Sequence, residues 1–260
     1  MIEMQRQDEA VWLTLRRAEK KNAMTEAMWE QLLQALSQVA DEHRRSGGRA
    51  PRALVLAGAP GAFCAGADIA ELAPLLREPA AMTANNQLVA RAQLALEQLP
   101  VPTLALIDGP CFGGGFGLAA ACDFRIASAR ASFAITPARL GLLYSIEDTR
   151  RVVRLLGDTR ARRLLLRGAR LDAQTAQDWG LLDALVEPEQ LQAQAQAWLA
   201  DICAQSPTSM TGIKATLAHV GQAGWHDEAE VRAAFDSAFY GSDFAEGAAA
   251  FLERRSARFH

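Results

Sequence analysis

The chain has 260 residues, of which 50% are hydrophobic and 22% charged, and its formal net charge is -3. This length suffices for one large domain with a full core, and the acidic balance excludes an overall electrostatic footprint for nucleic acid. The N-terminus lacks the basic start and apolar core of a signal peptide, and no apolar run approaches the roughly 20 residues of a membrane span. We therefore expect a soluble cytoplasmic protein.

The first half of the chain is predicted to alternate strands and helices. Two short continuous apolar runs, 52–58 and 102–109, are typical of strands buried on both faces. Residues 24–45 have apolar side chains at helical spacing, which places on one face Met28, Leu32, Ala35, Leu36 and Val39. The other predicted elements are a strand at 10–17, a helix opening within 63–72, a helix at 81–99, and strands at 124–128 and 131–136.

From about residue 147 onward the sequence predicts mainly helices. Their segments are 147–157, 158–168, 172–180, 189–204, 208–220 and 226–256. Asp148, Asp158 and Asp172 occupy expected N-cap positions, and Gly157, Gly168 and Gly180 expected helix ends. Strands first and helices later predict an α/β core with a helical C-terminal part.

The segments 52–72 and 102–122 repeat the same order of buried strand, glycine-containing turn and small-residue helix. Their turns and helices lie within FCAGADIAEL (63–72) and DGPCFGGGFGLAAACD (108–123). Glycines clustered in this way permit close packing of a helix on a strand, or they leave backbone N–H groups open to a ligand. Because a helix N-terminus carries unpaired N–H groups and partial positive charge, two converging ends can bind one oxyanion. Small residues at the contact, Ala67 and Gly114, would admit a carbonyl group.

Most other chemistries lack their motifs. There is no G-x-S-x-G, G-x-x-x-x-G-K-[ST], H-E-x-x-H or G-x-G-x-x-G segment. The cysteines form no C-x-x-C pair, so we expect reduced structural thiols and no metal site; they are Cys64, Cys111, Cys122 and Cys203. The histidines are interpreted as structural or exposed, and they are His43, His219, His226 and His260. The arginines between 150 and 167 are interpreted as a solvated helix face, with phosphate binding as the alternative.

The two glycine-containing segments together resemble the signature segments of the crotonase superfamily, the enoyl-CoA hydratase/isomerase family. The similarity covers nearly the whole chain, from RRAEKKNAMT near the start to EGAAAFLERRSARF at the end. The resemblance implies an α/β spiral of ββα units (1–200) followed by an α-helical C-terminal trimerisation region (201–260). It also implies an acyl-CoA substrate, no permanently bound cofactor, and assembly as a homotrimer or a dimer of trimers.

Several site residues follow from this resemblance. Ala67 and Gly114 match the backbone donors of the family's oxyanion hole. Ala23, Ala65 and Ile69 match adenine-pocket positions, and Lys20 or Lys21 would lie near the coenzyme A phosphates.

The departures from the family's pattern concern acid/base chemistry. The two glutamates of the hydratases fall on Gly117 and Pro137, neither of which transfers a proton. Tyr144 is the candidate proton donor, because a tyrosine at the matching position lines the pocket of decarboxylases in the superfamily, and Glu147 is the second candidate. The alternative for Tyr144 is a core tyrosine with a satisfied hydroxyl. Asp148 is a further acid/base alternative, although it is interpreted first as a helix cap, as is Asp68. A lyase or isomerase that stabilises a thioester enolate is the leading hypothesis, and the alternatives are a catalytically weak acyl-CoA binding protein and a structural partner that binds no coenzyme A.

The last helical segment is more apolar than a solvent-facing tail. We expect it to be buried between subunits as well as within one. Its large apolar side chains are Val231, Phe235, Phe239, Phe244, Phe251 and Leu252.

Overall fold

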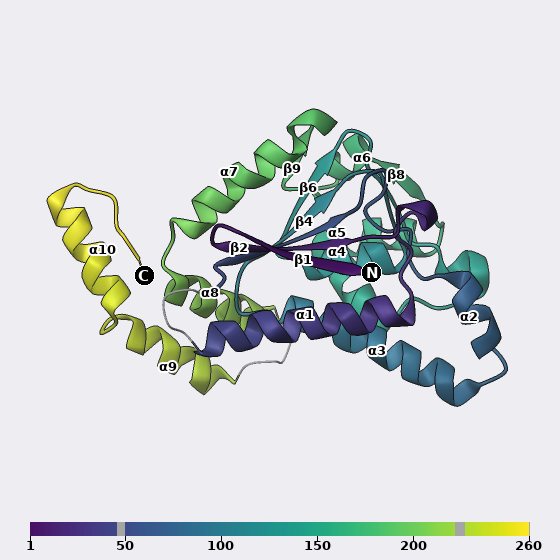
Figure 1. The fold of residues 1–260 in the computed structure, drawn as a ribbon, viewed down its shortest axis with the longest axis horizontal. Helices are drawn as coiled ribbons and strands as arrows, with labels where there is room; N and C mark the ends of the chain where they lie inside the picture. The colour runs from purple at the N-terminus through teal and green to yellow at the C-terminus, as the bar shows by residue number, and fades with distance from the viewer. Residues whose placement is uncertain (46–49, 222–226, 260) are drawn as a thin grey trace.

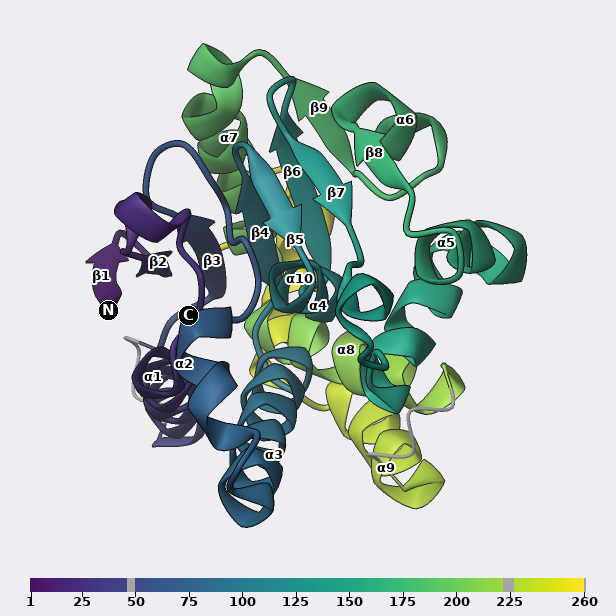
Figure 2. The same cartoon turned by 90° about the vertical axis from the view of Figure 1, so that its right-hand side faces the viewer.

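The computed structural model describes residues 1–45, 50–221 and 227–259 (Figure 1). Its larger sheet has six strands in the order β1-β2-β3-β4-β6-β9, in which only the β1–β2 pair is antiparallel. The strands are β1 (Ile2–Gln7), β2 (Ala10–Leu15), β3 (Ala53–Gly58), β4 (Thr103–Ile107), β6 (Phe124–Ser128) and β9 (Ala184–Val186). A smaller sheet, β5-β7-β8, contains β5 (Pro110–Phe112), β7 (Ser132–Ala134) and β8 (Arg170–Asp172), and lies in front of the larger one in Figure 2.

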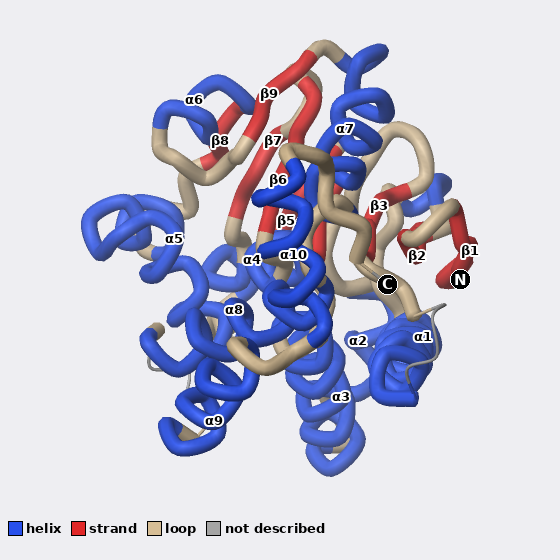
Figure 3. The backbone as a smooth tube through the Cα atoms, turned by 90° about the vertical axis from the view of Figure 1, so that its left-hand side faces the viewer, coloured by secondary structure: helices blue, strands red, loops and turns tan. Residues whose placement is uncertain are grey.

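The central strands β3 and β4 of the larger sheet are buried on both faces, as the continuous apolar runs predicted. Along β2, Leu13 packs in the main core and Trp12 in a second cluster on the opposite face. Helix α7 (Leu191–Cys203) covers that second face, to which it contributes Leu191, Ala195 and Leu199 (Figure 3). Alternating side chains of parallel strands thus fill two separate cores.

The remaining helices cover the other face or follow the sheets. They are α1 (Glu26–Arg45), α2 (Ile69–Leu75), α3 (Pro79–Glu97), α4 (Gly114–Ala121), α5 (Ile146–Leu165), α6 (Ala173–Asp178), α8 (Pro207–Val220), α9 (Glu228–Ala238) and α10 (Ser242–Glu253). The apolar face predicted for α1 is buried, and Trp29 joins it. Helix α5 spans two predicted helices, which meet at a break where Gly157 has φ 72°.

Four strands were missed by the sequence interpretation, among them the three-residue β5, which follows the strand predicted at 102–109. β8 and β9 lie in the half predicted to be helical, and both have three residues, which is too short for a periodic signal. Each is defined by its partner: β8 pairs with β7 and β9 with β6. The N-terminal strand β1 was missed as well, because its polar sequence IEMQRQ shows no buried run.

The predicted caps had mixed outcomes. The carboxylates of Asp68 and Asp172 accept hydrogen bonds from the backbone N–H groups of Ala70 and Thr175, so both caps are confirmed. The cap predicted at Asp148 is wrong: Ser145 caps α5 and accepts a hydrogen bond from the Asp148 N–H. Ser145 and Asp148 match the S-x-x-D pattern of a helix start. Asp158 follows the break in α5, where its carboxylate pairs with Arg162 at 2.7 Å.

The C-terminal helices expose aromatic side chains. Figure 1 shows α10 extending away from the two sheets. Phe235, Phe239 and Phe244 pack edge-to-face in a row across α9 and α10, yet each is more than half exposed. Among the described residues, no helix is long and apolar enough to cross a membrane.

Candidate active site

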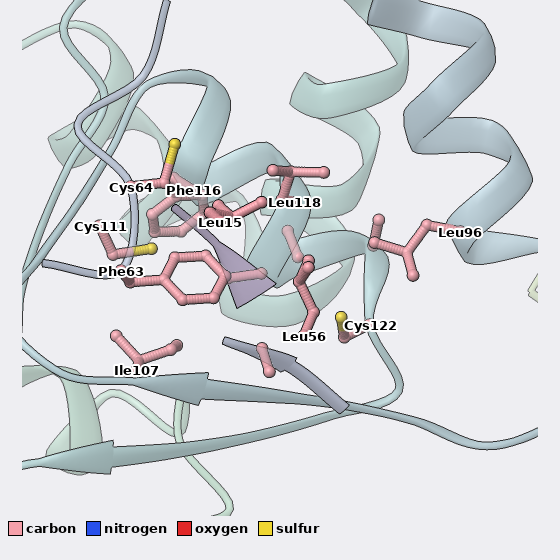
Figure 4. Packing of buried hydrophobic residues seen from close by; sticks show 14 of the residues in the cluster. Leu15, Leu56, Phe63, Cys64, Leu96, Ile107, Cys111, Phe116, Leu118 and Cys122 are labelled. Carbon is pink, nitrogen blue, oxygen red and sulfur yellow. The ribbon is translucent and has the colours of Figure 1, made fainter. Parts of the chain in front are cut away.

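The two glycine-containing junctions converge. The N–H of Cys64 donates to Pro110 O at 3.0 Å, and the N–H of Phe112 donates to Cys64 O at 2.9 Å. Figure 4 shows Cys64, Cys111 and Phe116 in the same part of the core. A Cβ on Gly115 would lie 2.7 Å from the Cys64 Cβ, closer than packed carbon atoms allow. The glycine therefore permits a contact between the junctions that a side chain would prevent.

The backbone N–H groups of Ala67 and Gly114, which come from different junctions, are among those that have no acceptor within the described residues. Met24 pairs with Ala67 through the N–H of Met24 on Gly66 O (2.8 Å) and the N–H of Asp68 on Met24 O (3.0 Å). In this parallel pairing the Ala67 N–H points away from Met24.

The two N–H groups are close neighbours. Gly114 is the first residue of α4, and a Cβ on it would lie 4.0 Å from the Ala67 nitrogen. Ala67 is exposed and Gly114 partly exposed, so this place is open to a ligand. The unpaired N–H groups at the start of α4 carry partial positive charge that favours an anionic oxygen.

The loop between β2 and α1 packs against the first junction. The buried Asn22 amide donates to Ala59 O (3.0 Å) and Ala62 O (2.7 Å), which fixes the loop in place. The Ala65 N–H donates to Lys21 O at 2.9 Å. The structure thus brings the Lys21 backbone directly against Ala65.

The other residues expected at a nucleotide pocket flank this contact. Lys20 and Lys21 are exposed, whereas Ala23 is 9% exposed. Ile69 begins α2 and is 49% exposed. Their positions form a continuous stretch of surface and loop beside Ala67.

Tyr144 packs against the second junction. Its hydroxyl donates to Gly113 O at 3.0 Å, and the Gly117 N–H donates to the same oxygen at 3.0 Å. That carbonyl belongs to the peptide group whose N–H is presented by Gly114. Burial raises the pKa of the Tyr144 phenol well above its usual value. Glu147, the other predicted acid/base residue, is exposed on the first turn of α5.

Asp148 is a buried residue of the site region, for which the sequence interpretation preferred a helix cap over an acid/base role. It is 5% exposed, and its carboxylate pairs with Arg151 at 2.9 Å. When the Gln93 amide is oriented with its nitrogen toward Asp148, which satisfies both of its polar atoms, it donates to the two carboxylate oxygens at 3.2 and 3.3 Å. Burial is the main cause that raises the pKa of Asp148, and the Arg151 charge opposes it. The S-x-x-D pattern at Ser145 was the sequence signal that Asp148 is not the cap.

The positions that matched the family's glutamates lie in different surroundings. Gly117 is buried on α4, one turn after Gly114, and faces the Asp148 carboxylate. Pro137 opens a 3-10 turn, η2 (Pro137–Leu140), directly after Thr136. Thr136 Oγ1 lies 3.8 Å from the position of a Cβ on Gly113.

The thiols and histidines add no further reactive group. Burial raises the pKa of Cys64 and of Cys122 to about 12, so both stay protonated at neutral pH. No cluster of three metal-binding side chains occurs within the described residues. His43 contacts Thr211 Oγ1 at 3.2 Å, in keeping with a structural role, whereas His226 and His260 lie outside the described residues.

The structure therefore has two converging strand–turn–helix junctions beside a mainly parallel sheet, with adjacent backbone N–H groups that make no hydrogen bond within the described residues. The sequence matches the enoyl-CoA hydratase/isomerase family over residues 5–260, and the chain belongs to that family. It is 30% identical over 261 residues to the probable enoyl-CoA hydratase echA6 of Mycobacterium bovis, with 100% of this chain and 99% of the relative covered.

Other relatives show how widely the family's reactions range. The mitochondrial delta(3,5)-delta(2,4)-dienoyl-CoA isomerase of Dictyostelium discoideum is 27% identical over 94% of this chain and 85% of its own length. A crystal structure of an enoyl-CoA hydratase from Bacillus anthracis superposes with a TM-score of 0.89 at 29% identity, covering 99% of this chain and 98% of that one. The α/β crotonase fold with two sheets and C-terminal helices is thereby confirmed.

Proposed function

We propose that this protein binds an acyl-CoA thioester and stabilises the enolate of its acyl group. The thioester oxygen accepts hydrogen bonds from the N–H groups of Ala67 and Gly114. The observation that carries this proposal is the pair of adjacent N–H groups without acceptors in the described structure. Oriented donors of this kind stabilise charge that develops in a transition state more than they stabilise the neutral substrate.

The coenzyme A part of the substrate lies along the loop between β2 and α1. Ala23, Ala65 and Ile69 contact the adenine ring, and Lys20 or Lys21 pairs with a phosphate. The hydrogen bond from Ala65 to Lys21 supports this assignment, because it joins the two segments that contribute these residues. No permanently bound cofactor is required, since the coenzyme arrives with the substrate.

The reaction differs from glutamate-assisted hydration, because Gly117 and Pro137 replace both glutamates. An acyl-CoA decarboxylase that uses Tyr144 is one form of the proposal, since decarboxylation needs chiefly enolate stabilisation and a late proton. The bond from the Tyr144 hydroxyl to Gly113 O means that its proton is already engaged in the free protein. A catalytically weak acyl-CoA binding protein is the other form.

We also propose a cytoplasmic homotrimer or dimer of trimers, in which residues 201–260 form the assembly region. The row of half-exposed aromatic rings on α9 and α10 supports it, because apolar surface of this kind is usually buried in a contact. Light scattering at micromolar concentration should show three or six chains, and a monomer would contradict the assembly.

The reaction is tested by incubating the protein with a panel of acyl-CoA thioesters and measuring product mass. Loss of carbon dioxide indicates decarboxylation, gain of water indicates hydration, and unchanged mass with thermal protection indicates binding alone. Free coenzyme A is the control for binding that does not involve the acyl group. Absence of both turnover and acyl-specific protection across the panel would overturn the proposed function.

A further inference from the structure

Gly117 and Asp148 occupy complementary places at the site. A Cβ on Gly117 would lie 2.3 Å from Gln93 Nε2, 2.7 Å from Asp148 Oδ1 and 3.0 Å from Asp148 Oδ2. A side chain at position 117 and the Asp148 carboxylate therefore exclude one another. The Asp148 carboxylate from α5 and the Gln93 amide from α3 together fill the space into which a side chain on α4 would otherwise project.

From these contacts we infer that Asp148 is the catalytic base of this protein, and that it replaces a carboxylate at position 117 from a different helix. This inference rests on the proposed acyl-CoA function. Gly114 and Gly117 are three residues apart on α4 and so share one helix face. The Asp148 carboxylate thus faces α4 at Gly117, one helical turn from the proposed oxyanion donor Gly114.

The surroundings of Asp148 allow it to accept and release a proton. Arg151 is held independently by Glu97, through Nε at 2.7 Å and Nη2 at 2.6 Å, and only Nη1 reaches Asp148. Protonation of Asp148 therefore leaves the Arg151 charge paired. Desolvation makes the carboxylate a stronger base than an exposed aspartate.

The proton-transfer step balances without any other reactant. The bond between the α-carbon and its hydrogen breaks, the proton moves to Asp148, and the electron pair passes into the thioester to give an enolate oxygen at Ala67 and Gly114. Return of a proton from Asp148 to the same carbon regenerates the thioester. In D2O the returned nucleus is deuterium, so the step is visible as a mass gain of the acyl-CoA.

The experiment measures deuterium incorporation into butyryl-CoA by the full-length protein and by Asp148→Asn. We expect Asp148→Asn to lower the exchange rate by about 10²–10⁴-fold with butyryl-CoA affinity within about twofold of the parent. An exchange rate within about threefold of the parent would overturn the inference, whatever the effect on stability. If butyryl-CoA stabilises the parent protein against heat but no deuterium is incorporated, Asp148 is not a catalytic base, while the proposed binding stands. If butyryl-CoA gives neither thermal stabilisation nor exchange, the proposed function is overturned.

A relocated carboxylate provides the decisive second test, which also applies if Asp148→Asn does not fold. Gly117→Glu alone should destabilise the protein, because two carboxylates compete for one place beside Gln93. Gly117→Glu combined with Asp148→Gly should fold and restore exchange to within about tenfold of the parent, and Asp148→Gly alone is its matched control. A folded double variant no more active than Asp148→Gly would show that a carboxylate there is only structural.

The pH profile separates a base from a structural ion pair. The charged or titratable groups around the Asp148 carboxylate are Arg151 on α5, Glu97 behind it on α3, and Tyr144 before α5. Since the pKa of Asp148 is raised, exchange should rise with pH through a value above the ordinary aspartate pKa of about 4 and then level off. The residual exchange of Asp148→Asn should lack this rise, and an unchanged profile would contradict the inference.

Discussion

The two junctions present equivalent N–H groups but are held in place by different forces. Helix α4 buries seven of its eight residues, and backbone contacts fix its start against Cys64. Helix α2 buries none, and a Pro74 interrupts its seven residues. Its start is held instead by the Asp68 cap, the ion pair of Asp68 with Arg17 at 2.6 Å, and the pairing of Ala67 with Met24. One donor is thus placed by core packing and the other by polar contacts at the surface.

The largest effect on the rate of deuterium exchange should come from removing the Gly114 N–H, the donor that core packing holds in place. Gly114 is the first residue of α4, where proline is well tolerated, so Gly114→Pro should fold and lose only the N–H. We expect a loss of about 10²–10³-fold in the exchange of butyryl-CoA, the usual effect of losing one oxyanion donor. Gly114→Ala is the matched control, because its Cβ would meet Trp29 at an ordinary 3.5 Å. Equal rates for the proline and alanine variants would place the donor elsewhere.

Overpacking the second junction should break its link to the first. In Gly115→Ala the new Cβ falls 2.7 Å from the Cys64 Cβ, so the two segments must separate. We expect a loss of about 1–3 kcal/mol in the free energy of unfolding, measured by denaturant titration. Gly212→Ala in α8 meets no atom within 4 Å and should leave stability unchanged or raise it. Similar results for both alanine variants would show that the close approach carries no packing constraint.

Weakening the surface junction should cost less stability. Asp68→Ala removes a cap and an ion pair, for an expected loss of about 0.5–2 kcal/mol in the free energy of unfolding. The hydrogen bond with Arg17 lowers the pKa of Asp68, so this stabilisation is present above the unfolded aspartate pKa of about 4 and lost as pH falls. The difference between parent and variant should therefore shrink in acid.

A second cap provides the control for this experiment. Asp172→Ala removes the cap of α6, which is remote from the candidate site in sequence. It should lower stability while leaving acyl-CoA protection intact, whereas Asp68→Ala should reduce both. If acyl-CoA stabilises Asp68→Ala against heat as much as it stabilises the parent, the Asp68 cap and ion pair are not needed to position the first junction.

Tyr144→Phe should have a moderate effect. The variant loses one hydrogen bond to Gly113 O, which polarises the peptide group that carries the Gly114 N–H. A net loss of about 0.5–1.5 kcal/mol corresponds to exchange about 2- to 12-fold slower. A loss of about 10²–10⁴-fold at unchanged affinity would instead identify Tyr144 as a proton donor.

Glu147→Gln should have the smallest effect. Its side chain is exposed on the first turn of α5, next in sequence to the buried Asp148. The rate of deuterium exchange and the equilibrium constant for unfolding should both stay within about twofold of the parent values. An exposed carboxylate near a helix start contributes little to either. A marked loss of exchange would mean that Glu147 turns toward the substrate.

The sequence by itself determined the family, the buried parallel strands and the two junctions. Continuous apolar runs at β3 and β4 and the glycines at Gly113 to Gly115 are local signals, and each specifies its backbone without reference to distant residues. The same holds for the caps at Asp68 and Asp172, where a side chain bonds the backbone two or three residues away. The apolar face of α1 is also local, since helical periodicity alone defines it.

Only the tertiary structure decided what depends on contact between distant segments. The three-residue strands β8 and β9 exist through their partners β7 and β6. The role of Asp148 depends on Gln93, Gly117 and Arg151, three residues contributed by three helices. The sequence shows that position 117 has no carboxylate. The packing of α3, α4 and α5 shows that Asp148 of α5 places a carboxylate beside it. Burial and long-range pairing are properties of the folded chain, so the sequence pattern does not reveal them.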